Sequence, residues 1–88
     1  MSKMIQGVST ILVMGKPITH QHILRNFGER LQKVRKSQGI SQEELAALLS
    51  MHRTYVGMVE RGERNPTIRT LYKIAKALKV KSSDLLPF

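Results

Sequence analysis

The chain of 88 residues contains no cysteine. It can therefore form no disulfide and no thiolate metal site, and it has no cysteine nucleophile; this fits a reducing compartment, and we expect a cytoplasmic protein. The longest apolar run is Ile11 to Met14, much shorter than the ~20 residues that a membrane span requires. The N-terminus also lacks the apolar core of a signal peptide, so we expect neither export nor a membrane location.

Acidic residues are scarce: six Asp and Glu stand against fifteen Lys and Arg, a net charge of +9. Such a charge is typical of a protein that binds a polyanion. The few acids are scattered over helical surfaces and none is fixed near His52, so we expect no enzyme. His20 and His22 alternate as strand residues do, but two imidazoles without a third ligand make a poor metal site, and we expect neither metal nor cofactor.

The chain divides into two regions by composition. Residues 1–22 are β-branched, interrupted by glycine and nearly uncharged, whereas residues 23–88 have a helical pattern of apolar residues. Thr10 to Met14 predicts a short strand and Gly15 to Pro17 a turn. A hairpin, an arm exchanged between subunits and a disordered tail all fit this N-terminal extension, because an isolated two-stranded hairpin is marginal in water.

Residues 23–88 predict an all-α domain of five helices with short connections around one core. The first helix begins at about Ile23, carries Phe27, Leu31 and Val34 on one face, and ends near Gly39. Thr67 caps a later helix, and a last short turn begins at Ser82 or Ser83. The expected buried stripe of the later helix consists of Ile68, Leu71, Ile74, Ala75 and Leu78.

The middle segment, Ser41 to Pro66, has the sequence SQEELAALLSMHRTYVGMVERGERNP and predicts two short helices joined by a tight turn. Ser41 and Glu44 fit a capping box at the start of the first helix. The second helix begins at His52 or Arg53 and ends at Gly62, with Val56 and Val59 inward. This is a helix-turn-helix, in which outward residues early in the second helix reach base edges in the major groove. The outward residues are Arg53, Thr54, Tyr55, Gly57 and Met58.

Several motifs recur here in one register: GISQEELA at 39–46, HRTYV at 52–56, ERG at 60–62, RNP at 64–66 and LKV at 78–80. With them, the chain from Asn26 to Leu86 resembles the Cro and phage-repressor helix-turn-helix family of bacterial transcriptional regulators. The run HRTYVGMVERGERN is most similar to the controller proteins of restriction-modification systems, which are homodimers that bind paired operator half-sites. The chain departs from the family pattern in its 22-residue leader, and in Ser50 and Lys79, which stand where glycine is usual.

The resemblance implies a set of base contacts. Arg53 would recognise guanine through O6 and N7, and Thr54 would touch a base or a thymine methyl group. Tyr55 would contact a base or a phosphate, and Met58 would lie at the edge of the groove.

The resemblance also implies phosphate contacts. Ser41 and Gln42 would bind phosphate through backbone N–H groups and the amide side chain at a helix N-terminus, although capping alone also explains Ser41. Arg61, Arg64 and Asn65 would contact the backbone near the end of the second helix, although the Asn-Pro turn explains Asn65 equally well.

There are two structural expectations, the first from the family register and the second from the number of apolar residues. Arg35 and Glu60 should form a partly buried ion pair that fixes the second motif helix against the first helix of the domain. Leu85, Leu86 and Phe88, with part of the Thr67 to Leu78 helix, should form a dimer interface, because these apolar residues exceed what so small a core can cover.

The leading hypothesis is a homodimeric, sequence-specific transcriptional regulator that binds a pseudo-palindromic operator on double-stranded DNA, with half-sites about 34 Å apart. A restriction-modification operon is the expected target, and RNA polymerase an expected protein contact. The alternative hypothesis is an antitoxin that uses the same fold to repress its own gene while residues 1–22 bind a toxin.

Overall fold

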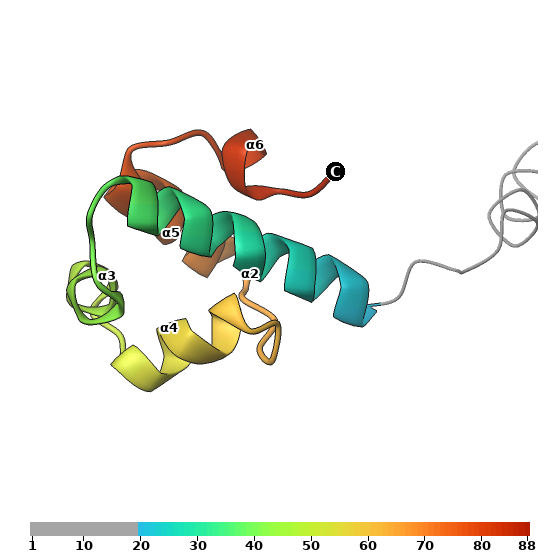
Figure 1. Cartoon of the computed structure of the whole chain (residues 1–88), viewed down its shortest axis with the longest axis horizontal. Helices are drawn as coiled ribbons and strands as arrows, with labels where there is room; N and C mark the ends of the chain where they lie inside the picture. Colours follow the sequence, from blue (N-terminus) through green and yellow to red (C-terminus); the bar gives the residue numbers. More distant parts are fainter. Residues whose placement is uncertain (1–19) are drawn as a thin grey trace, which may run out of the picture.

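The computed structural model describes residues 20–88, and every regular element in that part of the chain is a helix (Figure 1). The predicted all-α fold with five helices is therefore confirmed, whereas the strand expected at Thr10 to Met14 lies outside the described residues. The helices are α2 (His20–Ser37), α3 (Gln42–Leu49), α4 (Arg53–Glu60), α5 (Ile68–Leu78) and α6 (Ser82–Leu85).

Helix α2 begins at His20, three residues before the start expected at Ile23. The expectation that His20 and His22 alternate along a strand is therefore wrong. Ile23 and Leu24 are half-buried one turn before the buried Phe27, so the apolar face begins at Ile23 as expected, and the helix continues over the three residues before it. Within residues 20–88, no three His, Asp or Glu side chains lie together as metal ligands. No helix in this range is long and apolar enough to cross a membrane.

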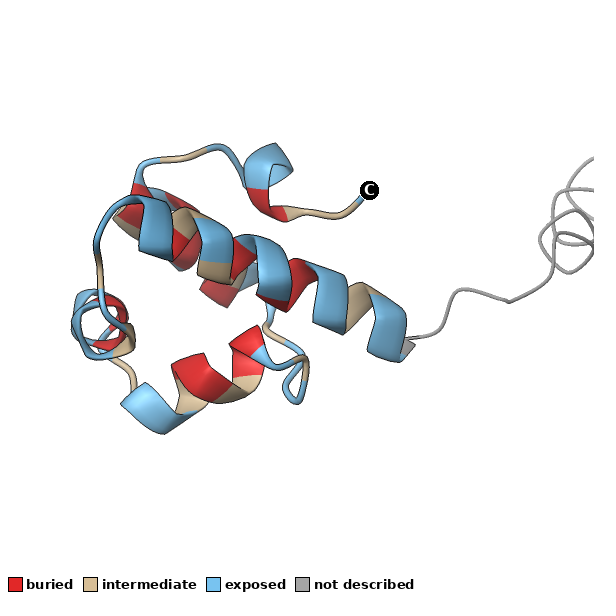
Figure 2. Cartoon of the chain, in the orientation of Figure 1, coloured by how far each residue is buried: buried red, intermediate tan, exposed pale blue. Residues whose placement is uncertain are grey.

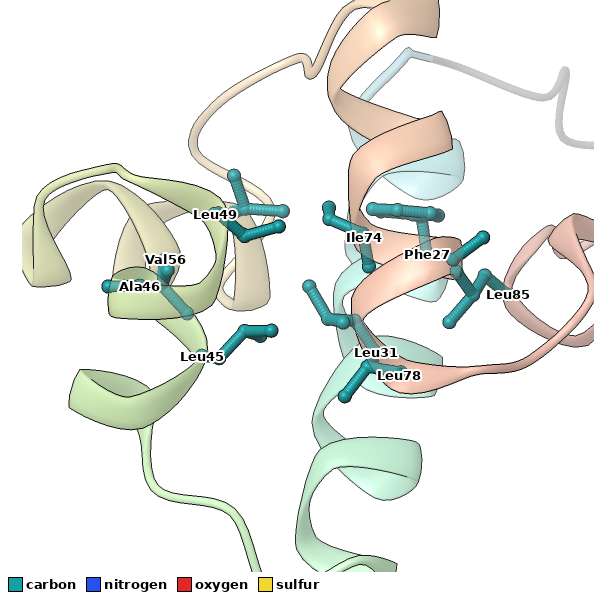
Figure 3. Close-up of a cluster of buried hydrophobic side chains, with 11 residues drawn as sticks. Phe27, Leu31, Leu45, Ala46, Leu49, Val56, Ile74, Leu78 and Leu85 are labelled. Atoms are coloured by element: carbon teal, nitrogen blue, oxygen red, sulfur yellow. The ribbon is translucent and has the colours of Figure 1, made fainter.

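One hydrophobic core joins all five helices. Leu45 and Leu85 have no exposed surface, and Leu31, Ile74 and Leu78 are each 1% exposed. Figure 3 shows side chains of α3 and α4 facing those of α2, α5 and α6. The core residues are Phe27, Leu31, Leu45, Ala46, Leu49, Val56, Val59, Ile74, Ala75, Leu78 and Leu85.

Four of the helices end in the same turn, in which one residue takes a left-handed conformation. These residues are Gly39, Ser50, Gly62 and Lys79, with φ of 70°, 55°, 77° and 58°. The next N–H then donates to a carbonyl five residues back, as Ile40 does to Arg35 at 3.2 Å and Val80 does to Ala75 at 3.0 Å. The expected ends at Gly39 and Gly62 are confirmed, and a serine and a lysine make the same turn without glycine.

The burial of two apolar residues differs from expectation. Ile68 was expected in the buried stripe of α5 but is 81% exposed. Leu85 was expected at the dimer interface, yet it lies at 0% exposure in the core of its own chain. That assignment is wrong because the four-residue α6 folds back onto α2 and α5, and Leu85 is the buried residue that anchors it. Leu86 is half-buried, and Phe88 is 85% exposed.

Candidate nucleic-acid interface

The N-terminus of α3 is closed by the capping box that the sequence predicted. The Ser41 Oγ accepts a hydrogen bond from the Glu44 N–H at 3.0 Å, and the Ser41 N–H donates to the Glu44 Oε1 at 2.8 Å. The N–H groups of Gln42 and Glu43 precede the first bond of the helical ladder, so they point out of the helix end. Together with the helix dipole, they favour an anion at this position.

Helix α4 begins at Arg53, within the predicted limits. His52 is its N-cap, and the imidazole Nδ1 accepts from the Thr54 N–H at 3.3 Å. Arg53 and Thr54 are exposed in the first turn, which Figure 2 shows as the pale blue end of α4. Arg53 lines one surface hollow with Ser41, Gln42 and Glu43, at the N-terminus of α3. An arginine beside two helix N-termini is electrostatically unfavourable unless an anion joins it.

The later residues of α4 are less accessible than expected. Tyr55 is half-buried and packs against the core, and Met58 is also half-buried. Gly57 was expected to face outward, but it is buried. A Cβ atom at this glycine would lie 3.2 Å from Nη1 of Arg61 and 3.7 Å from Oε1 of Gln42, so these two side chains cover it.

The predicted ion pair between Arg35 and Glu60 is confirmed. The Arg35 Nε donates to Glu60 Oε2 at 2.6 Å and Nη2 donates to Oε1 at 3.0 Å, with the two side chains 8% and 1% exposed. Arg35 also donates through Nη1 to the Ile40 carbonyl at 2.8 Å, so one guanidinium holds α4 and the turn before α3. This pair fixes the orientation of α4 relative to α2.

Two glutamines complete the network around Glu60. The Gln42 Nε2 donates to Glu60 Oε1 at 2.9 Å, and the Gln32 Nε2 donates to the same oxygen at 3.4 Å. Burial alone would raise the pKa of Glu60, but the hydrogen bonds from Arg35 and Gln42 and the charge of Arg35 together lower it. Sequence reasoning missed Gln32, although its spacing of three residues from Arg35 places both on one face of α2.

The position of Gln42 refines its expected role. Its amide was expected to reach phosphate, but one amide N–H is directed inward to Glu60. The phosphate contact of Gln42 and of the backbone N–H groups beside it stays a prediction. The amide links the N-terminus of α3 to Glu60 at the end of α4.

The turn after α4 carries a second ion pair, which sequence reasoning did not anticipate. The Arg61 Nε and Nη2 donate to the two carboxylate oxygens of Glu63, at 3.0 and 3.1 Å. The hydrogen bond and the charge of Glu63 raise the pKa of Arg61, and the hydrogen bond from Arg61 lowers the pKa of Glu63. Arg64 and Asn65 are exposed in the same loop.

Helices α2 and α4 approach each other closely at Gly28. A Cβ atom there would lie 2.4 Å from the Glu60 carbonyl oxygen and 2.5 Å from that of Val59. Only a residue without a side chain fits this crossing. The signal in the sequence was a glycine directly after the apolar Phe27, in the interior of a predicted helix where glycine is unfavourable.

A model of the helix-turn-helix family matches residues 31–85, more than half of the chain. The chain belongs to this family, as its motif residues predicted, and it is a DNA-binding regulator of the helix-turn-helix class. The matched range contains the Arg35 to Glu60 pair, both motif helices and all of α6.

Among proteins known by sequence, the chain is 44% identical over 63 residues to the control protein C.BamHI of Bacillus amyloliquefaciens, covering 70% of this chain and 78% of that protein. It is 47% identical over 60 residues to the control protein C.SmaI of Serratia marcescens, covering 68% and 71%.

The solved structure of the restriction-modification controller protein C.AhdI from Aeromonas hydrophila is similar to the chain with a TM-score of 0.70 and 44% identity. The match covers 72% of this chain and 96% of that one.

Proposed function

We propose that the chain is a homodimeric, sequence-specific transcriptional regulator that controls a restriction-modification operon. The observation that carries this proposal is the exposed pair Arg53 and Thr54 on the first turn of α4, beside the N-terminus of α3. The buried Arg35 and Glu60 hold these two helix ends in a fixed relation. The similarity to the control proteins C.BamHI and C.SmaI and to the restriction-modification controller protein C.AhdI supports the proposed target, a restriction-modification operon.

The N-termini of α4 and α3 would have different roles in DNA binding. Arg53 would read guanine in the major groove, and Thr54 a neighbouring base or thymine methyl. The first turn of α3 would bind phosphates, as would the turn and loop after α4, which contain Arg61, Arg64 and Asn65. These contacts would set the register of the protein on the DNA. Tyr55 and Met58, half-buried on α4, would contribute only at the groove edge.

Selection of bound fragments from random-sequence DNA tests the function directly. The expected product is a pseudo-palindrome whose half-sites are centred about 34 Å apart, one helical turn, as two symmetric recognition helices require. Recovery of fragments without a common sequence would contradict specific regulation. Recovery of a single unrepeated site would contradict the dimer.

Base reading by Arg53 is tested by gel shift with Arg53→Ala on the selected operator and on random-sequence duplex. The loss of one bidentate guanine contact should weaken operator binding by about 1 to 3 kcal/mol. The matched control is Arg30→Ala, because Arg30 is an exposed arginine on the side of α2 that faces α6. Equal operator binding by Arg53→Ala and wild type would refute base reading.

The proposed dimer surface is an apolar groove between α2, the start of α5 and the C-terminus. Ile68 and Phe88 line it at 81% and 85% exposure, with the half-buried Leu71 and Leu86. Large apolar side chains this exposed favour association with a second surface. A second copy of the chain would cover the groove and place two recognition helices on one face of DNA.

Sedimentation equilibrium tests this surface. Ile68→Asp and Phe88→Asp should each shift the protein from dimer towards monomer. Leu48→Asp is the matched control, since Leu48 is a 59% exposed apolar residue outside the groove. A dimer that persists in both groove variants would exclude this interface.

A further inference from the structure

Glu63 is a carboxylate placed beside the surface that is proposed to meet DNA. Its partner Arg61 follows directly after α4, and the two side chains are 51% and 59% exposed. A carboxylate at such a position repels phosphates, and an exposed ion pair contributes little to folding. Neither stability nor simple charge attraction explains a glutamate here.

The geometry of the pair is specific. Glu63 uses both oxygens and engages the Nε and Nη2 atoms of Arg61, which form one edge of the guanidinium. The Nη1 atom lies 3.2 Å from where a Cβ of Gly57 would be, and Oε1 of Gln42 lies 3.7 Å from the same point. The guanidinium therefore reaches one turn back along α4 to Gly57, the glycine that the Gln42 side chain of α3 also approaches.

Gly57 makes this arrangement possible. Any side chain at this position would meet Nη1 of Arg61 first, at a distance tighter than ordinary van der Waals contact. Since no side chain projects from Gly57, the guanidinium of Arg61 covers that part of α4. The guanidinium thus covers the same glycine as the side chain of Gln42, the first residue of α3, whose first-turn N–H groups favour an anion.

We propose that Glu63 is a positioning residue that holds Arg61 with its Nη1 and Nη2 edge directed at a DNA phosphate bound near the N-terminus of α3. The inference rests on the proposed function, since it assigns a role within the same interface. A guanidinium has five N–H groups, so two can bind the carboxylate while the outer edge still makes a bidentate contact with phosphate. Glu63 reduces the rotamer freedom that Arg61 would otherwise lose on binding.

A double-mutant cycle on DNA binding tests the proposal, with Glu63→Gln, Arg61→Ala and the double variant, all in the full chain. If Glu63 positions Arg61, Glu63→Gln alone should weaken binding about two- to fivefold, although it removes a negative charge. In the Arg61→Ala background the same change should strengthen binding, because only the repulsion of phosphate is then removed. Opposite effects of Glu63→Gln on DNA affinity in the two backgrounds are the diagnostic result.

The matched control is Glu43→Gln. Glu43 is an exposed carboxylate in the hollow beside Arg53, and it is not part of an ion pair among residues 20–88. Its replacement should strengthen binding in both backgrounds. Thermal unfolding of Glu63→Gln should match wild type, which separates positioning from a structural defect.

Tighter binding by Glu63→Gln in the wild-type background would overturn the proposal, because Glu63 would then be only a repulsive charge. Since the contact is to phosphate, the sign reversal is also expected on a random-sequence duplex at low salt. Failure to select an operator would contradict the proposed function, whereas this measurement would still decide the role of Glu63.

Discussion

A Cβ atom on Gly28 would lie 2.4 Å from the main-chain oxygen of Glu60, which is closer than such atoms approach in proteins. The obstruction is backbone, so no side-chain rotation relieves it. Gly28→Ala should therefore destabilise the domain by about 1 to 3 kcal/mol, even though alanine favours helix. Urea unfolding measures the change, and Glu29→Ala, at an exposed site on the same helix, is the control. Equal or greater stability of Gly28→Ala would show that α2 and α4 can separate without loss.

The buried pair of Arg35 and Glu60 should be costly to break from one side. Glu60→Ala leaves a guanidinium at 8% exposure without its carboxylate, and the expected loss is about 3 to 5 kcal/mol. Replacing both partners with apolar residues of similar size, Arg35→Met with Glu60→Leu, should restore most of this loss. Chemical denaturation of the single and double variants gives both values. No loss in Glu60→Ala would mean that the pair does not hold α4.

The same pair predicts how stability depends on acid. The folded-state pKa of Glu60 lies below its ordinary value of 4.5 because hydrogen bonds and the charge of Arg35 outweigh burial. The stabilisation is therefore fully present above pH 4.5 and is lost as the pH falls through the folded-state pKa. The double variant Arg35→Met with Glu60→Leu should lose less stability than wild type as the pH falls below 4.5. Parallel loss in the two proteins would refute this origin of the acid dependence.

The two left-handed residues that are not glycine predict stabilising substitutions. Ser50 and Lys79 have φ of 55° and 58°, a region that side chains disfavour. Ser50→Gly and Lys79→Gly should each raise stability by about 0.5 to 1 kcal/mol. Lys79→Ala removes the charge but keeps the Cβ atom, so it should not reproduce the gain. Thermal melting of the three variants separates backbone strain from charge.

The features that sequence predicted well depend on local spacing. The capping box of Ser41 needs only Glu44 three residues later, and the start of α4 at Arg53 needs only the break before it. The pairing of Arg35 with Glu60 crosses 25 positions, and it was predicted from the family register because no local rule joins these two residues.

The features that sequence missed depend on how the helices pack. Ile68 fits the apolar stripe of α5 by period, but at the first position of the helix it lies beyond the core and is exposed. Leu85 was assigned to a dimer surface because the size of the monomer core could not be judged from the sequence. Gly57 lies among outward residues by period, yet long side chains from Gln42 and Arg61 reach back to cover it.

Helix α4 separates its residues into two sets. Val56, Val59 and Glu60 are buried and hold the domain together, whereas Arg53 and Thr54 are exposed and contribute little to the core. Substitutions at the exposed pair therefore leave folding almost unaffected. Under the proposed base reading by Arg53 and Thr54, the preferred DNA sequence can change during evolution without a loss of stability, so related chains would share this scaffold and yet recognise different sites.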